Sequence, residues 1–286
     1  MRFINPKTDF AFKKIFGDEQ NKDILISFLN AILYQGNSAI ESLEILNPYQ
    51  PPKIRGVKDT YLDIRAKLNN EQTVIIEMQV LNVEGFEKRI LYNAAKAYSI
   101  QLDTGADYTL LNPVIALTIT DFEMFPNLDK VISRFILKEK DFLVDYLIYD
   151  IELVFVELPK FGKKLEELET VTDKWIYFLK NAKSLELVPE KMGEVPAIQK
   201  AFEVANRADL TREELEDLEH QEIYIQDQRN ATIKAVKQAV SKAVKQAVKE
   251  KAIDIAKGLL DVLDEATIAQ TTELSIEEIQ KLKQSR

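Results

Sequence analysis

Two neighbouring stretches of the chain alternate apolar and polar residues with the period of a β-strand: YLDIRAKL at 61–68 and TVIIEMQV at 73–80. The short polar segment NNEQ separates them, which predicts an antiparallel hairpin with a buried face. Asp63, Glu77 and Gln79 lie within these strands, among residues that are otherwise typical of a buried sheet. Any fold of this chain must therefore provide partners for two carboxylates inside a sheet.

The register of this hairpin determines whether the two carboxylates meet. If Leu68 pairs with Gln72 across a three-residue turn at 69–71, Asp63 lies directly opposite Glu77 on one face. A two-residue Asn-Asn turn would instead separate them, because a shift of one residue exchanges the two faces of a strand.

Like charges that face each other across a sheet are destabilising unless a cation compensates them. A divalent metal ion would do so. Oxygen ligands without histidine or cysteine suit Mg²⁺ or Mn²⁺, which keep waters and complete their shell with substrate phosphate. The alternative is structural: both acids form ion pairs on a solvated sheet face, with Arg65, Lys67 or Arg89 as partners. Spacing alone leaves both interpretations open.

The composition removes several classes of function. The chain has no cysteine, which excludes disulfides, thiolate metal sites and a cysteine nucleophile. The single histidine, His220, lies in an acidic helical context and is expected to be a solvated helix residue, so a Ser-His-Asp triad or an HExxH zinc site is not supported. Neither a GxxxxGK[ST] nor a GxGxxG loop is present, so we expect no nucleotide cofactor.

The charge is unevenly distributed. The net charge of -9 argues against a uniformly basic surface for nucleic acid, yet segment 53–96 carries eight Lys and Arg against six Asp and Glu. Segment 210–229 carries seven acids against two bases. There is no run of about 18 apolar residues and no apolar segment followed by a cleavage site, so we expect a cytoplasmic protein with no membrane contact.

Periodicity predicts the order α-β-β-β-α-β, followed by further strands and then helices. The predicted elements are two helices within 5–33 with a break near Gly17, strands at 40–48, 53–68 and 73–81, a helix at 84–105, a buried strand at 112–122, further strands at 133–140 and 151–161, and helices from about Glu166. We predict an α/β (α+β) domain at 1–165, a helical extension at 166–230 that packs on it, partly through Trp175, and a C-terminal helical region at 231–286.

Segment 234–252 repeats Ala-Val followed by two mostly polar residues four times, which predicts a long helix with a narrow apolar stripe and a lysine-rich face. The first interpretation is a solvated face on a self-associating or partner-binding helix, and the alternative is an arm that contacts DNA. The acidic tail resembles a small helix-turn-helix-like unit in which Ser275 and Glu278 form a capping box, and packing or oligomerisation is its expected role.

The chain resembles the PD-(D/E)XK nuclease superfamily, and more closely its Rpn-type branch of recombination-promoting nucleases, also described as transposases. The resemblance rests on KTDFAFKKIFG (7–17), DTYLDIRAKLNNEQTVIIEMQ (59–79), the helix and strand within 86–119, and VFVELPKF (154–161), and it covers residues 1 to about 180. It implies a restriction-endonuclease-like core in which a mixed sheet is flanked by helices, in agreement with the predicted order of elements.

The resemblance also implies roles for the hairpin residues. Asp63 corresponds to the motif aspartate and Glu77 to the (D/E) position, both as metal ligands, with the carbonyl of Met78 as a further ligand. Gln79 stands where most of the superfamily has lysine, although the Rpn-type branch commonly has glutamine there. A glutamine amide can hydrogen-bond the attacking water but lacks the full charge of lysine, which leaves the level of activity open.

Further candidates surround the hairpin in sequence. Asp9 and Tyr92 are secondary site candidates, and candidates for phosphate contacts are Lys13, Lys58, Arg65, Arg89 and Lys96. Arg89 and Lys96 are seven residues apart and so lie on nearly one face of the predicted helix. For these positions a solvated helix or an ion pair with the carboxylates is the alternative.

The leading hypothesis is a Mg²⁺-dependent (or Mn²⁺-dependent) DNA endonuclease that uses Asp63, Glu77 and Gln79, in a context of recombination, mobile elements or defence. The first alternative is an inactive nuclease-fold scaffold that acts through its C-terminal helices, and a second is a DNA-binding module formed by those helices. A homo-oligomer is expected, because cutting both strands of DNA requires two sites.

Overall fold

The computed structural model describes residues 3–50 and 60–284. These residues fall into two compact units, within Met1–Ile225 and Gln226–Arg286, which are described separately below. The long helix α7 (Arg212–Leu259) begins in the first unit and continues into the second.

The first unit is built on a mixed six-stranded sheet. In spatial order its strands are β1 (Leu43–Leu46), β4 (Ile64–Leu68), β5 (Thr73–Gln79), β6 (Val114–Thr120), β8 (Ile151–Glu157) and β7 (Ile132–Phe135). The strands β5, β6 and β8 are parallel, whereas β1, β4 and β7 pair antiparallel with their neighbours. Every residue of β6 is buried, as its nearly continuous apolar sequence predicts.

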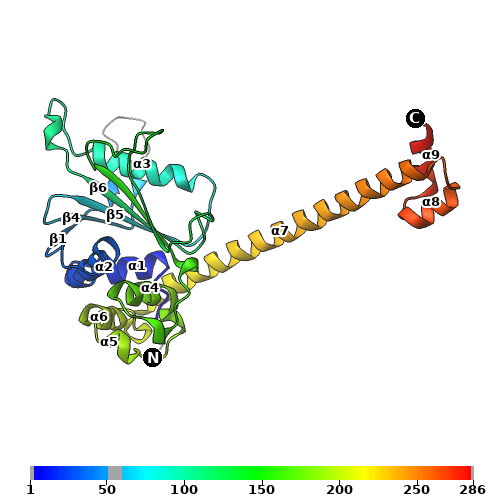
Figure 1. Cartoon of the computed structure of the whole chain (residues 1–286). Coiled ribbons are helices and arrows are strands. Elements are labelled where there is room, and N and C mark those ends of the chain that lie inside the picture. The colour runs from blue at the N-terminus through cyan, green and yellow to red at the C-terminus, as the bar shows by residue number, and fades with distance from the viewer. Residues whose placement is uncertain (1–2, 51–59, 285–286) are drawn as a thin grey trace. The chain divides into compact units, whose positions relative to one another are not determined.

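Helices cover both faces of this sheet (Figure 1). One face packs against α1 (Asp9–Phe16), α2 (Lys22–Tyr34), α4 (Val171–Asn181) and α6 (Pro196–Val204), with the short α5 (Glu190–Gly193) beside them. The other face packs against α3 (Phe86–Ser99), whose Ala94 and Ala97 lie against Ile75 and Ala116. The predicted mixed sheet flanked by helices, in the order α-β-β-β-α-β, is confirmed.

Of the two hairpin registers that the sequence left open, the structure has the one with the three-residue turn. Ile64 pairs with Ile76 and Lys67 with Thr73, and the amide of Leu68 donates to the carbonyl of Gln72 at 2.9 Å. The turn has three residues, and its last one, Glu71, adopts a left-handed conformation with φ of 70°. Continuing the ladder beyond Ile64 and Ile76 places Asp63 at the level of Glu77.

Two predicted strands are wrong in part. Of the strand predicted at 53–68, residues 53–59 lie outside the described part of the chain. The remainder forms two strands instead of one: β3 (Thr60–Tyr61) pairs with β2 (Tyr49–Gln50) in a separate ribbon, and β4 begins only at Ile64. The break occurs because the side chain of Asp63 accepts a main-chain hydrogen bond, which competes with the strand. The strand predicted at 133–140 ends at Phe135, beyond which the chain forms an exposed loop.

The helix that carries Trp175 belongs to the core of the first unit. Trp175 is fully buried, its ring lies 5.7 Å from those of Phe16, Phe28 and Phe178, and its indole N–H donates to the hydroxyl of Ser27 at 3.2 Å. Residues from before and after the sheet in sequence therefore share one aromatic cluster.

The second unit contains the C-terminal part of α7 together with α8 (Glu265–Thr272) and α9 (Ile276–Gln284). Its small core consists of Ala256, Ile268, Leu274 and Ile279. The predicted capping box is confirmed, since Ser275 and Glu278 exchange side-chain to main-chain hydrogen bonds of 3.0 and 3.2 Å. The hydrogen bond from the Lys249 ammonium and, to a smaller extent, the hydrogen bond from the Ser275 N–H lower the pKa of Glu278 to about 2.

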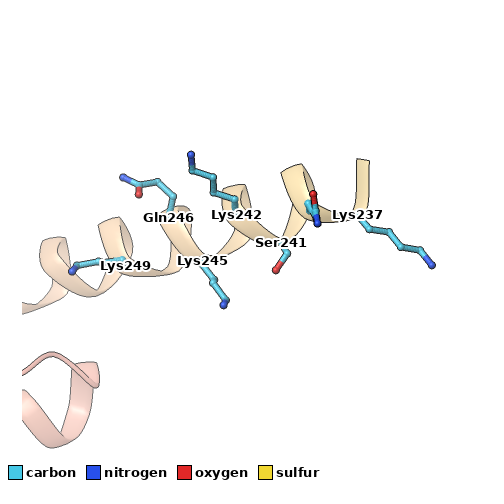
Figure 2. Close-up of a pocket in the computed structure, with 7 residues that line it drawn as sticks. Lys237, Ser241, Lys242, Lys245, Gln246 and Lys249 are labelled. Atoms are coloured by element: carbon cyan, nitrogen blue, oxygen red, sulfur yellow. The ribbon is translucent and has the colours of Figure 1, made fainter. Parts of the chain in front are cut away.

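The repeat segment of α7 exposes both of its faces within the described part of the chain. Val236, Val240, Val244 and Val248 are each more than half exposed. An open groove of about 580 Å³ follows the opposite side and is lined by lysines, glutamines and one serine. Figure 2 shows that Lys237, Lys242, Lys245 and Lys249 point in different directions along the helix. Because these groups do not converge, the groove is a solvated helix face and not a ligand site.

Among the described residues, no helix is both long enough and apolar enough to cross a membrane.

Replacing Trp175 with alanine should lower the free energy of unfolding of the first unit by about 3 to 5 kcal/mol, because a large buried ring leaves a cavity between helices and sheet. Chemical denaturation followed by circular dichroism measures this loss. Trp175→Phe serves as the matched control and should lose less, since it keeps most of the ring contacts. A loss below about 1 kcal/mol for the alanine variant would show that this helix does not support the core.

Candidate active site

The open end of the hairpin carries the three polar residues that the sequence singled out. The strand β5 continues past its last ladder pair with β4, so among the described strands Glu77, Met78 and Gln79 pair with β6 alone, on their other side. Asp63 bends away from the strand at this point, and its Oδ2 accepts the main-chain N–H of Met78 at 2.7 Å. The N–H and C=O of one strand residue point to the same side, so the carbonyl of Met78 faces the same open edge.

Asp63 is half-buried among groups from two elements, α1 and β5. The ammonium of Lys13 on α1 lies 3.8 Å from its Oδ1, and Lys13 is itself bound to Asp9 at 2.6 Å. The carboxyl group of Asp9 lies within hydrogen-bonding reach of Asp63. Burial, with a smaller contribution from Asp9, raises the pKa of Asp63 to about 7, against the opposing effects of the Met78 N–H and of Lys13. Asp9 and Lys13 are thus adjacent to the central aspartate.

Glu77 is buried on the face of the sheet that α3 covers. Its Oε1 accepts a hydrogen bond from the amide of Asn93, and its Oε2 lies 3.5 Å from Nη2 of Arg89. Burial raises the pKa of Glu77, although the charge of Arg89 and both hydrogen bonds lower it in part. Asn93 was not among the predicted residues. Its position four residues after Arg89, on the same helix face, is the signal that could have identified it.

Gln79 is held at both ends of its amide group. Its Nε2 donates to the carbonyl of Leu81 at 2.7 Å, and its Oε1 accepts from Nη2 of Arg89, also at 2.7 Å. Arg89 therefore bridges Glu77 and Gln79 with one nitrogen, while its guanidinium lies 5.0 Å from the ring centre of Phe86. A positive charge is present beside Gln79 even though the residue itself is neutral.

The remaining residues that were predicted to contact phosphates lie in different environments. Lys58 is outside the described residues. Arg65 lies on β4, where burial lowers its pKa and its Nε has no hydrogen-bond partner among the described groups. Lys96 is buried and donates to the carbonyl of Gln50 at 2.8 Å, which ties α3 to the β2–β3 ribbon, and its ammonium lies 6.0 Å from the ring centre of Tyr92. Phosphate contacts by these residues stay predictions.

The chemistry of the donors fits a divalent cation that keeps part of its water shell. Glu77 is buried and Asp63 is half-buried, and the pKa of both carboxyl groups is raised, so their negative charge is incompletely compensated by the protein. No group of three or more His, Asp or Glu side chains with metal-binding geometry occurs in the described part of the chain. A site of two carboxylates and a main-chain carbonyl suits Mg²⁺ or Mn²⁺, which commonly bind through few protein ligands, and is too sparse for ions that need a full protein cage.

The family model described as PD-(D/E)XK nuclease family transposase matches residues 6–235 of the chain. The match covers the sheet, the helices on both of its faces and the start of α7. No match is found among curated proteins or among solved structures.

The raised pKa of Asp63 predicts how stability depends on pH. The folded protein holds this proton more tightly than the unfolded chain, so the contribution of Asp63 is fully present below its ordinary pKa of 3.8 and is lost as the pH rises through about 7. Asp63→Asn cannot ionise and keeps an oxygen for the Met78 N–H. Without added metal, its melting temperature should exceed that of the wild type at pH 8 by a few degrees, and the difference should shrink towards pH 5.

Differential scanning fluorimetry across this pH range measures the effect, with the exposed Asp129→Asn as the matched control. A constant difference between Asp63→Asn and the wild type at all pH values would contradict the raised pKa.

Proposed function

Because the chain belongs to the PD-(D/E)XK nuclease family transposases, we propose that it is a metal-dependent DNA endonuclease with Asp63, Glu77 and Gln79 at its reaction centre. The observation that carries this proposal is the bond from the Met78 N–H to Asp63. It fixes the half-buried carboxylate of Asp63 beside Met78, the residue that directly follows Glu77, at the open end of the hairpin. The contacts that the protein supplies leave the pKa of both carboxyl groups raised, so a cation that joins the pair would offset a cost that these contacts do not remove.

Asp63, Glu77 and the carbonyl of Met78 are the proposed ligands of Mg²⁺ or Mn²⁺. When bound, the ion would lower the pKa of a coordinated water and neutralise charge on the phosphodiester. Asn93 and Arg89 orient the carboxylate of Glu77 through their contacts with its two oxygens, and the Met78 N–H does the same for Asp63.

Gln79 is proposed to position the attacking water. An amide nitrogen carries two hydrogens, and only one of them is needed for the bond to Leu81, so the second is available for a water molecule. Arg89 fixes the other end of the amide and supplies the positive charge that a lysine at position 79 would carry. Arg89 is therefore proposed to stabilise charge on the phosphate in addition to orienting Gln79.

The proposed context is DNA breakage in recombination, in mobile elements or in defence. A homo-oligomer is proposed as well, because the exposed valines of α7 offer an apolar stripe to a second helix. The same stripe is the observation that favours the alternative function, an inactive nuclease-fold scaffold that acts through self-association.

Purified protein should nick supercoiled plasmid with Mg²⁺ or Mn²⁺ and not with EDTA, and Asp63→Ala and Glu77→Ala should each abolish nicking, because each removes one of the two proposed carboxylate ligands of the ion. Agarose gel assays measure this, with circular dichroism to verify that both variants are folded. Equal activity of the wild type and both variants would indicate a contaminating nuclease, and equal inactivity would favour the scaffold.

Arg89→Ala should lower the rate of plasmid nicking by about 10²-fold, because it removes a preorganised charge and releases one end of Gln79. Arg89→Lys should lose less, since it keeps the charge but not the bond geometry. Arg212→Ala is the matched control, as Arg212 is exposed and pairs with Glu216 one helical turn away. Initial rates under saturating metal distinguish the three, and full activity of Arg89→Ala would remove Arg89 from the mechanism.

A further inference from the structure

A pocket of about 860 Å³ opens beside the candidate active site, between the β2–β3 ribbon and the first half of α3. Arg89 and Asn93, which contact Glu77, form part of its wall. The pocket therefore shares Arg89 and Asn93 with the carboxylate site, and its volume is in the range of small-molecule sites.

Two tyrosines line this pocket. Tyr61 is 75% exposed, yet its ring is held in place: it packs against Tyr49 with ring centres 4.9 Å apart and an interplanar angle of 33°. The ribbon that carries both rings is fixed by the bond from Lys96 to the carbonyl of Gln50. An aromatic face that is exposed and also preorganised is suited to stacking, because little conformational freedom is lost when a planar ligand binds.

Tyr92 extends from α3 into the same pocket and is 39% exposed. Lys88 and Arg89 lie one turn before it on the helix, and both line the pocket, together with Glu84, the one carboxylate among its described lining residues. The wall thus combines aromatic faces with two cations, which is the combination that proteins use to bind single-stranded nucleic acid. An aromatic face recognises the base, and the cations recognise the phosphates.

The faces of paired bases in a duplex are covered by their neighbours, so a tyrosine can stack only on a base that is unpaired or has left the helix. We propose that this pocket binds an unpaired nucleotide next to the scissile phosphate, with its base against Tyr61 and Tyr92 and its phosphate at Lys88 and Arg89. The proposal rests on the endonuclease function and adds the substrate class: single-stranded DNA, or duplex DNA with unpaired nucleotides at the cleavage point.

Fluorescence anisotropy in EDTA tests binding separately from cleavage. The probes are a labelled single-stranded oligonucleotide, the same sequence as a blunt duplex, and the duplex with a short gap. The wild type should bind the single strand and the gapped duplex at least about tenfold more tightly than the blunt duplex.

Tyr61→Leu and Tyr92→Leu should each weaken binding of the single strand by about five- to 100-fold and leave binding of the blunt duplex unchanged. Tyr61→Phe keeps the ring and should retain wild-type binding. The matched control is Tyr108→Leu, which changes a tyrosine that is 82% exposed and does not line the pocket. An oligonucleotide with 2-aminopurine gives a second readout, because stacking quenches its fluorescence.

Equal binding of single strand and blunt duplex, or unchanged binding of the single strand by both leucine variants, would overturn the pocket proposal even if plasmid is cut. The converse result, tyrosine-dependent binding of the single strand by a protein that does not nick plasmid with any metal, would support the pocket and reject the endonuclease. Circular dichroism of the variants and the retained binding of Tyr61→Phe separate a lost ring from a lost fold.

Discussion

The hydrogen bond from the main-chain N–H of Met78 to the carboxylate of Asp63 determines how the candidate site is built. It gives β5 a partner where β4 has bent away, so that a side chain replaces a strand at the end of the hairpin. The same bond fixes Asp63 beside Glu77 and leaves the edge that carries the Met78 carbonyl open. One contact therefore ends a β-ladder and positions a carboxylate.

The side chains that contact the two carboxylates come from helices on opposite faces of the sheet. Lys13 and Asp9 reach Asp63 from α1, and Arg89 and Asn93 reach Glu77 from α3. Neither helix removes the cost of burial, since the pKa of both carboxyl groups remains above its ordinary value. This residual cost is what binding of a divalent cation would offset, and it is the physical reason that a metal-dependent reaction is proposed for this part of the sheet.

Arg89 links the carboxylate site to the pocket beside it. Its guanidinium contacts Glu77 and Gln79, and the same residue forms part of the pocket wall with Tyr61 and Tyr92. A glutamine in place of the usual lysine is thereby accompanied by a neighbouring cation that the helix supplies. The proposals for charge stabilisation and for recognition of an unpaired nucleotide meet at this one side chain, which is why separate measurements of cleavage and binding are needed.

The sequence by itself determined the order of helices and strands and the capping box at Ser275, because each follows from spacing within a few residues of the chain, whereas it left two hairpin registers open and the structure selected one. Only the tertiary structure decided where β4 begins, that Asn93 holds Glu77, and that the β2–β3 ribbon carries Tyr61 to the pocket. The single strand predicted over 53–68 was wrong for the same reason. The strand breaks where Asp63 accepts the N–H of Met78, and the ribbon is held by the hydrogen bond from Lys96 to Gln50. Both contacts join residues that are far apart in sequence, so a local sequence pattern does not predict them.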